Sequence, residues 1–180
     1  MIIETIDEIA YPLDTVYGVM RDDLPKLVPF LPQVKYIEVL SREDSEPGSI
    51  RIVNKWQGTL DQAPRVARPF LKEEMVAWKD HARWVDADHR VEWRFESLVG
   101  DRYFDCNGEN FFEAVGEGST RVKITGELKV HPERLPGVPK FLARKVAPAV
   151  EKYIINLITP NLRNLAQGVR GYLDSIREPA

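Results

Sequence analysis

The sequence predicts an α+β fold in which a curved, seven-stranded antiparallel sheet wraps around a long C-terminal helix. Three observations support this prediction. Apolar and polar residues alternate over much of residues 34–131, which is typical of strands with one buried face. Short turns separate these segments, so neighbouring strands must be antiparallel. A helical pattern then runs from about residue 139 to residue 176 and supplies an apolar stripe to cover the sheet.

Length and composition favour one globular domain that covers residues 1–180. A chain of 180 residues is within the size range of a single domain and buries about 70% of the surface that its unfolded form exposes. Hydrophobic residues make up 43% of the chain and charged residues 29%, which is a globular balance and not a disordered one. The net charge of −3 gives no indication of a nucleic-acid partner.

The N-terminus and the cysteine content predict a soluble, cytoplasmic protein. The opening MIIETIDEIAY has acidic residues where a secretory signal would be basic, and it lacks an apolar run and a cleavage site. No stretch of the sequence approaches the ~20 apolar residues of a transmembrane segment. Cys106 is the only cysteine, so the chain cannot form an internal disulfide, which favours a reducing compartment.

The N-terminal segment predicts a strand followed by two short helices. Residues 2–10 interleave isoleucines with polar residues and are predicted to form a strand. Pro12 ends this strand and suits the first turn of a helix that continues to about Arg21. A second helical piece follows with Asp22 or Asp23 as its cap, and three prolines keep it short.

Six further strands are expected at residues 34–41, 48–58, 75–85, 89–98, 102–115 and 120–131. Glycine-containing turns separate the first pair and the last pair of these strands. One long connection, residues 59–74, interrupts the meander and contains Arg65 and Arg68. These arginines would either gate a pocket and pair with an acidic head group, or simply lie in a solvated loop.

The C-terminal segment from about Pro139 to Ile176 predicts a bent helix or two helices in series. Apolar residues recur at spacings of three and four along it. Pro148 and Pro160 each remove one backbone hydrogen bond from a helix. Thr159, which precedes Pro160, resembles a cap followed by a new first turn.

The buried faces of the strands carry an unusual set of side chains. All four tryptophans fall on the apolar side of their strands. Asn54, Asp80 and Asn110 interrupt the apolar pattern on that same side. Each of them needs a hydrogen bond, a water or a ligand, because a buried polar group without partners costs about 1–3 kcal/mol. Small residues among the large rings favour a cavity, with a solid aromatic core as the alternative.

We therefore expect a mainly apolar ligand cavity between the sheet and the helix, without a cofactor. Asp80 is the best acid or base candidate, because a carboxyl group on an apolar face should have a raised pKa; a structural partner would explain it equally well. Asn54 and Asn110 either orient a ligand or bridge strands. The expected ligand-binding residues are Asn54, Trp56, Trp78, Trp84, Trp93, Phe95, Phe104, Asn110, Phe112, Val146, Val150, Tyr153 and Leu157.

The sequence carries no recognisable metal, nucleotide or nucleophile motif. His81, His89 and His131 are far apart, and none belongs to an HExxH motif or a Cys/His cluster. There is no P-loop, no GxGxxG and no GxSxG sequence. Cys106 faces inward among aromatic residues, where an inert small hydrophobe is the default interpretation.

The order of the elements resembles the START-like (SRPBCC, polyketide cyclase/dehydrase) helix-grip superfamily over nearly the whole chain. The segment IDEIAYPLDTVYGVMRDDLPKLVPFLPQVKYIEVL is similar to the opening of these proteins, and STRVKITGELKV is similar to their closing strand. The resemblance is architectural, since the superfamily shares no active-site residues. It implies that a lipid, sterol, quinone or polyketide-like molecule binds between sheet and helix. The two helix prolines and the long tail depart from the shorter members.

Three function classes are compatible with these residues. The first is binding, with or without transport, of a hydrophobic small molecule. The second is an enzyme of the aromatase/cyclase or dehydratase type that uses Asp80 in the same cavity. The third is a lipid-surface or protein-interaction module that acts through the tail, where eight basic and three acidic residues lie between Arg134 and Ala180. Such a tail either makes a peripheral membrane contact or only complements the acidic sheet. The oligomeric state stays open.

Overall fold

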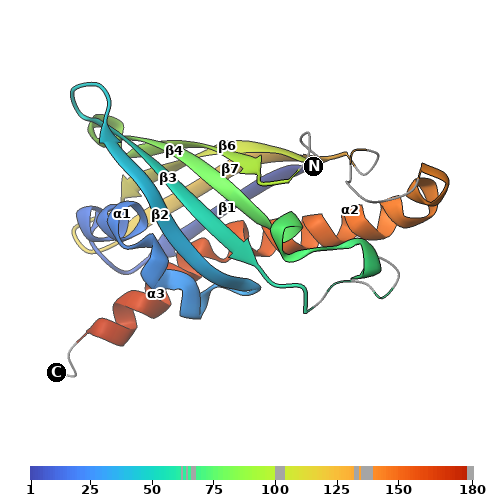
Figure 1. The fold of residues 1–180 in the computed structure, drawn as a ribbon. Coiled ribbons are helices and arrows are strands. Elements are labelled where there is room, and N and C mark those ends of the chain that lie inside the picture. The colour runs from blue at the N-terminus through green and yellow to red at the C-terminus, as the bar shows by residue number, and fades with distance from the viewer. Residues whose placement is uncertain are drawn as a thin grey trace.

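The computed structural model contains one antiparallel sheet and a set of helices on its concave side (Figure 1). The described residues are 1–61, 63, 65, 68–99, 104–131, 134 and 140–177, and the side chains of 70, 140–144 and 146 are outside this description. The strands are β1 (Ile2–Ile9), β2 (Val34–Asp44), β3 (Ser49–Gly58), β4 (Ala77–Val85), β5 (Arg90–Ser97), β6 (Phe104–Ala114) and β7 (Thr120–Val130).

The sheet has the order β1-β7-β6-β5-β4-β3-β2, and every neighbouring pair is antiparallel. Strands β2 to β7 therefore form the meander that the alternating pattern predicts, and the fold class is confirmed. Strand β1 is the edge strand next to β7 and pairs with it, with Ile3 opposite Gly126. Residues 102 and 103, the first two of the strand predicted at 102–115, lie outside the described residues.

Two helical pieces follow the first strand, as expected. Helix α1 (Leu13–Asp22) begins after Pro12, and the 3₁₀ helix η1 (Leu24–Phe30) follows with Asp23 at its N-cap position. The Asp23 side chain makes no capping hydrogen bond. The long connection contains two more short 3₁₀ helices, η2 (Arg68–Phe70) and η3 (Glu73–Val76), and η4 (Asp86–Asp88) links β4 to β5.

The tail forms two helices in series, α2 (Lys140–Arg163) and α3 (Leu165–Ile176). The expected new helix start at Thr159–Pro160 is wrong, because α2 continues through both prolines and ends only at Arg163. Asn164 separates the two helices. In Figure 1, α2 crosses the open side of the sheet, and α3 extends beyond it on the side of α1.

A side chain from outside the helix compensates for one of the two prolines. Pro160 has no N–H group with which to bond the carbonyl of Asn156, four residues earlier. The side chain of Gln33 donates a hydrogen bond from Nε2 to this carbonyl at 3.3 Å. Gln33 has a φ of 62°, which is uncommon for a residue with a side chain. The turn between η1 and β2 therefore helps α2 to continue through Pro160.

The core lies between the concave face of the sheet and the helices. All four tryptophans are buried, together with aliphatic residues from α1, α2 and α3. The opposite face of the sheet is polar, and His81 on that face contacts Glu96 at 2.7 Å. The parity of the strand sequences thus predicts correctly that the four tryptophans, Asn54, Asp80 and Asn110 are inside. Among the described residues, no helix is long and apolar enough to cross a membrane.

Two glycines that face each other across β6 and β7 make room for a large ring. Gly108 pairs with Gly126, and Gly108 also lies opposite Trp93 on β5. A Cβ atom at Gly108 would lie 2.1 Å from the carbonyl oxygen of Thr125 and 2.5 Å from the Trp93 ring. A Cβ atom at Gly126 would lie 2.7 Å from the same ring. The Trp93 indole therefore packs directly against the backbone of the sheet.

Candidate functional site

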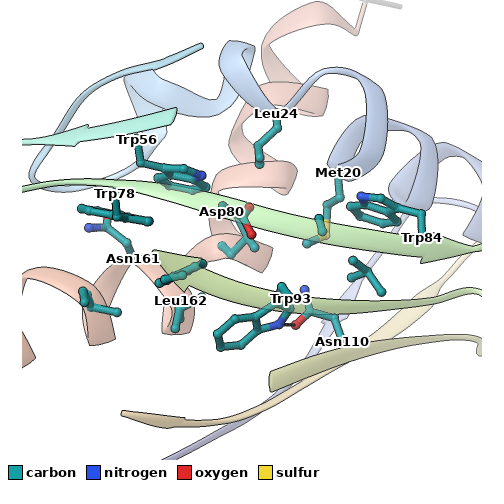
Figure 2. A pocket seen from close by; sticks show the side chains of 15 residues that line it. Met20, Leu24, Trp56, Trp78, Asp80, Trp84, Trp93, Asn110, Asn161 and Leu162 are labelled. Atoms are coloured by element: carbon teal, nitrogen blue, oxygen red, sulfur yellow. Dashed lines mark hydrogen bonds between the residues drawn. The ribbon is translucent and has the colours of Figure 1, made fainter. Parts of the chain in front are cut away.

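A cavity lies between the middle of the concave face and the helices, and Figure 2 shows its lining. Its lining residues are Met20, Leu24, Trp56, Trp78, Asp80, Ala82, Trp84, Val91, Trp93, Phe95, Asn110, Ile158, Asn161, Leu162 and Leu165. The volume open to the centre of a water-sized sphere is about 40 Å³. This volume is well below the ~150 Å³ of a cavity that holds benzene in an engineered protein. A ring-sized ligand therefore fits only if some lining side chains move apart.

The floor of the cavity comes from cross-strand pairs on β3, β4 and β5. Trp56 lies opposite Trp78, and Ala82 lies opposite Trp93. Asp80 is at the centre of this arrangement, between the two tryptophans of β4 (Figure 2). Because side chains two residues apart point to the same face of a strand, the sequence W-x-D-x-A-x-W of β4 places all four of its residues in the cavity.

The roof comes from two parts of the chain that are far apart in sequence. Met20 of α1 and Leu24 of η1 cover one side of the cavity, and Asn161 and Leu162 of α2 cover the other (Figure 2). Leu165, the first residue of α3, completes the lining. The break between α2 and α3 is therefore adjacent to the cavity.

The carboxyl group of Asp80 is buried without a counter-charge. The residue is 7% exposed, and its Oδ1 atom has no hydrogen-bond partner. Burial raises the pKa of this carboxyl to about 7, although the neighbouring Trp56 and Asn54 side chains oppose the increase. The Trp56 Nε1 atom also lacks a hydrogen-bond partner, so the two groups are neighbours without a well-aligned bond. A carboxyl with this pKa changes its charge near neutral pH.

Several other polar atoms in the cavity wall have no partner. The indole N–H groups of Trp56, Trp78 and Trp84 make no hydrogen bond, and neither does Oδ1 of Asn161. Asn161 does donate from Nδ2 to the carbonyl of Leu157 at 2.8 Å. Because most buried polar groups in proteins are hydrogen-bonded, these atoms need partners from water or from a ligand, and their concentration around one cavity makes it the candidate binding site.

Trp93 is the exception among the four tryptophans, because its indole N–H donates to Oδ1 of Asn110 at 2.9 Å. We expect Trp93→Phe to leave this oxygen buried and unpaired, and to destabilise the protein by about 3 kcal/mol through the lost bond and the smaller ring. Urea unfolding would measure this loss. Trp78→Phe is the matched control, because the Trp78 indole has no partner to lose. Equal losses in both variants would contradict the role of the Trp93–Asn110 bond.

The structure places the expected site residues in three groups. Seven line the cavity, namely Trp56, Trp78, Asp80, Trp84, Trp93, Phe95 and Asn110. Six are buried but do not line it, namely Asn54, Phe104, Phe112, Val150, Tyr153 and Leu157. The side chain of Val146 lies outside the described residues. Contact between any of these residues and a ligand stays a prediction.

The expected contribution of the helix was placed too early in the sequence. Tyr153 donates its hydroxyl proton to the carbonyl of Thr59, and Leu157 packs against Gly58 at the end of β3. This part of α2 therefore covers the rim of the sheet, and the described tail side chains that line the cavity lie within residues 158–165. Periodicity alone identifies the apolar stripe of a helix, but not the point at which the helix crosses the sheet.

Sequence reasoning also missed residues that the fold adds from other elements, namely Met20, Leu24, Ala82, Val91, Ile158, Asn161, Leu162 and Leu165. Ala82 and Val91 have the same parity as the predicted tryptophans, so the strand pattern would have found them. Asn161 interrupts the apolar face of α2, as Asp80 does on β4, and this was the available signal. Nothing in the sequence pattern indicates Met20 or Leu24.

Other candidate groups take no part in the cavity. Burial raises the pKa of the Cys106 thiol to about 12, with a further contribution from Asp80, so the thiol stays protonated at neutral pH. Arg68 donates to the carbonyls of Leu60 and Asp61, and Arg65 is exposed, so neither lines the cavity. Among the described residues there is no group of three or more potential metal ligands.

The basic residues that the structure describes on the tail are exposed, for example Lys145, Lys152 and Arg163. Arg170 instead donates to the carbonyl of Glu8 on β1. Arg170 is thus used within the fold. Peripheral membrane contact through the basic tail stays a prediction.

Comparison with solved structures identifies the architecture. The protein TTHA0849 from Thermus thermophilus has 21% sequence identity and a TM-score of 0.63, over 98% of this chain and 100% of that chain. The Zhui aromatase/cyclase from Streptomyces has 14% identity and a TM-score of 0.61, over 99% and 96% of the two chains. A START superfamily protein from Mycobacterium smegmatis has 15% identity and a TM-score of 0.53, over 98% and 99%. The chain has the START-like helix-grip fold.

This result confirms the resemblance that the element order predicts, at the level of the fold. No protein-family model matches the chain, and no curated protein matches it either. Since identities of 14–21% with these structures show the fold alone, the chemistry of the cavity has to be argued from its own side chains.

Proposed function

We propose that this START-like protein binds a hydrophobic small molecule, such as a lipid, a quinone or a polyketide-like compound, between the sheet and helix α2. The observation that carries this proposal is the cavity itself, whose wall contains all four tryptophans of the chain. Mainly apolar cavities with a few polar groups are typical of small-molecule sites. Binding by a cytoplasmic carrier is the simplest function for such a cavity, because a carrier needs no catalytic group.

Bromobenzene is a suitable first probe, because it is neutral and its heavy atom quenches the fluorescence of nearby indoles. All four tryptophans line the cavity, so the intrinsic fluorescence reports on occupancy directly. We expect saturable quenching of the wild-type protein. Ala82→Leu places a larger side chain in the cavity and should weaken binding at least about tenfold, which corresponds to ~1.4 kcal/mol.

Ala114→Leu is the matched control, because Ala114 is an exposed residue at the end of β6. This variant should bind bromobenzene as the wild type does. Quenching that does not saturate, or that is the same in Ala82→Leu, would contradict the proposal. Native mass spectrometry of the purified protein would then identify the natural ligand by its mass.

A second candidate function is an enzyme of the aromatase/cyclase or dehydratase type. It is supported by the Asp80 carboxyl, which is buried in the cavity and has a pKa of about 7. A general acid or base works best when its pKa is near the working pH. If Asp80 is catalytic, incubation of the natural ligand with wild-type protein converts it to a product of different mass, and Asp80→Asn does not. An unchanged ligand mass with both proteins would leave binding as the function.

A further inference from the structure

The described lining of the cavity contains an acidic side chain and no basic one. Asp80 is the only one of the fifteen lining residues with an ionisable side chain. Among the described residues no charged group affects its pKa, and its Oδ1 atom has no hydrogen-bond partner. The elements packed around it contribute neutral groups, namely Asn54 and Trp56 from β3, Phe95 from β5, Leu24 from η1 and Asn161 from α2. Burial raises the pKa of the Cys106 thiol, and Asp80 is close enough to raise that pKa further, so the thiol is neutral.

Aromatic rings form a continuous row beside this carboxyl. The rings of Trp56 and Trp78 are stacked, with centroids 5.8 Å apart and an angle of 16° between their planes. The row continues from Trp78 to Phe95 at 5.8 Å and from Phe95 to Trp93 at 5.0 Å. The face of an aromatic ring carries negative electrostatic potential and attracts cations, most strongly for tryptophan.

The two unpaired oxygens add to this potential. Oδ1 of Asp80 and Oδ1 of Asn161 are both buried without a donor, and both residues line the cavity (Figure 2). An isolated buried carboxylate is costly unless it is paired with a positive charge. In the part of the chain that the structure describes, no lysine, arginine or histidine lines the cavity, so these residues do not supply a positive charge.

We infer that the ligand of this cavity carries an ammonium group, with Asp80 as its counter-ion and the row of aromatic rings as its walls. This inference rests on the proposed function and names the chemical class of the molecule that is bound. The apolar part of the ligand contacts the aliphatic roof, while its positive charge satisfies the carboxylate. The unpaired indole N–H groups are available to oxygen atoms elsewhere on the same molecule.

Two probes of the same shape test the inference. Phenyltrimethylammonium and tert-butylbenzene differ only in the replacement of a positively charged nitrogen by carbon. At pH 8, where Asp80 is ionised, we expect the cation to bind wild-type protein at least about tenfold more tightly than its neutral counterpart. Competition against bromobenzene, followed by tryptophan fluorescence, measures both affinities.

Asp80→Asn should reduce this preference at least about tenfold and keep the binding of tert-butylbenzene. Asp44→Asn is the matched control, because it removes the same charge from an exposed position on β2 and should keep the preference. A preference that survives in Asp80→Asn overturns the inference. So does equal binding of the two probes by the wild type, and in that case the proposed function stands. Failure of bromobenzene and of both other probes to bind overturns the proposed function as well.

A measurement on the wild type alone serves if Asp80→Asn does not fold. Binding of a cation next to a partly protonated carboxyl displaces its proton, so phenyltrimethylammonium should release protons at pH 6.5, whereas tert-butylbenzene should not. Calorimetry in buffers with different ionisation enthalpies measures this release. Cation binding without proton release would overturn the assignment of Asp80 as the counter-ion.

Discussion

Asp80→Asn is expected to stabilise the protein in the absence of ligand, and the gain should be largest above neutral pH. Burial without a partner raises the pKa of this carboxyl from its ordinary value of 3.8 to about 7. Between these two values the unfolded chain has lost the proton and the folded protein still holds it. Wild-type stability therefore falls as the pH rises through this interval, and it stays low above it.

The size of the effect follows from the shift. A shift of about three pH units at 1.36 kcal/mol per unit amounts to about 4 kcal/mol at pH 8. The asparagine side chain has a similar shape and carries no charge, so it avoids this cost. We expect the difference in the free energy of unfolding between Asp80→Asn and wild type to grow by about 3 kcal/mol from pH 5 to pH 8.

Guanidinium unfolding of both proteins at the two pH values measures this difference. Comparison of the two proteins at each pH removes the contribution of every other titrating group. Asp44→Asn is again the control, since this exposed residue should show a difference near zero at both values. A gap between Asp80→Asn and wild type that is independent of pH would mean that Asp80 is not a buried, unpaired acid.

Gly108→Ala is expected to destabilise the protein by about 3 kcal/mol or more. The new methyl group would lie 2.1 Å from the carbonyl oxygen of Thr125 and 2.5 Å from the ring of Trp93. The ring is held by its bond to Asn110, and the carbonyl belongs to the backbone of β7. Neither the ring nor the β7 backbone can move without losing hydrogen bonds or contacts. Overpacking of this kind typically costs about 1–3 kcal/mol, sometimes more.

Urea unfolding measures this cost, and near-ultraviolet circular dichroism reports any displacement of the Trp93 ring. Gly118→Ala is the matched control, because a Cβ atom at Gly118 has no neighbour within 4 Å. It should leave both readings unchanged. If Gly108→Ala were as stable as Gly118→Ala, the close packing of Trp93 on the sheet would be wrong.

The sheet was predictable because β3 to β7 each carry one mainly apolar and one mainly polar face. The alternation in β4, for example, assigns Trp78, Asp80 and Trp84 to the inside, and the structure places all three there. Pairing of β1 with β7 was not derivable from spacing, because 110 residues or more separate the partners in the chain. The pairing of β1 with β7 could be expected only from the resemblance to helix-grip proteins.

The candidate site was predictable only on its sheet side. A strand fixes the direction of each side chain by parity, so the floor of the cavity follows from the sequence. The roof depends on the position along α2 at which the helix crosses the sheet. That position depends on long-range contacts such as that of Leu157 with Gly58 at the end of β3. Similarly, the end of α2 at Arg163 rather than at Thr159 reflects the support that Gln33 gives to the helix, and such a long-range contact leaves no local signal.

The contact between Gln33 and Asn156 has a consequence for how a ligand enters. At Pro160 helix α2 lacks one backbone hydrogen bond. The side-chain amide of Gln33 donates instead to the carbonyl of Asn156 at 3.3 Å. Ile158, Asn161 and Leu162, which cover the cavity, lie within one turn of this point. Because the helix already lacks one backbone hydrogen bond here and relies on one amide contact instead, we expect it to bend more easily at this point than elsewhere, which would widen a space too small for a benzene ring.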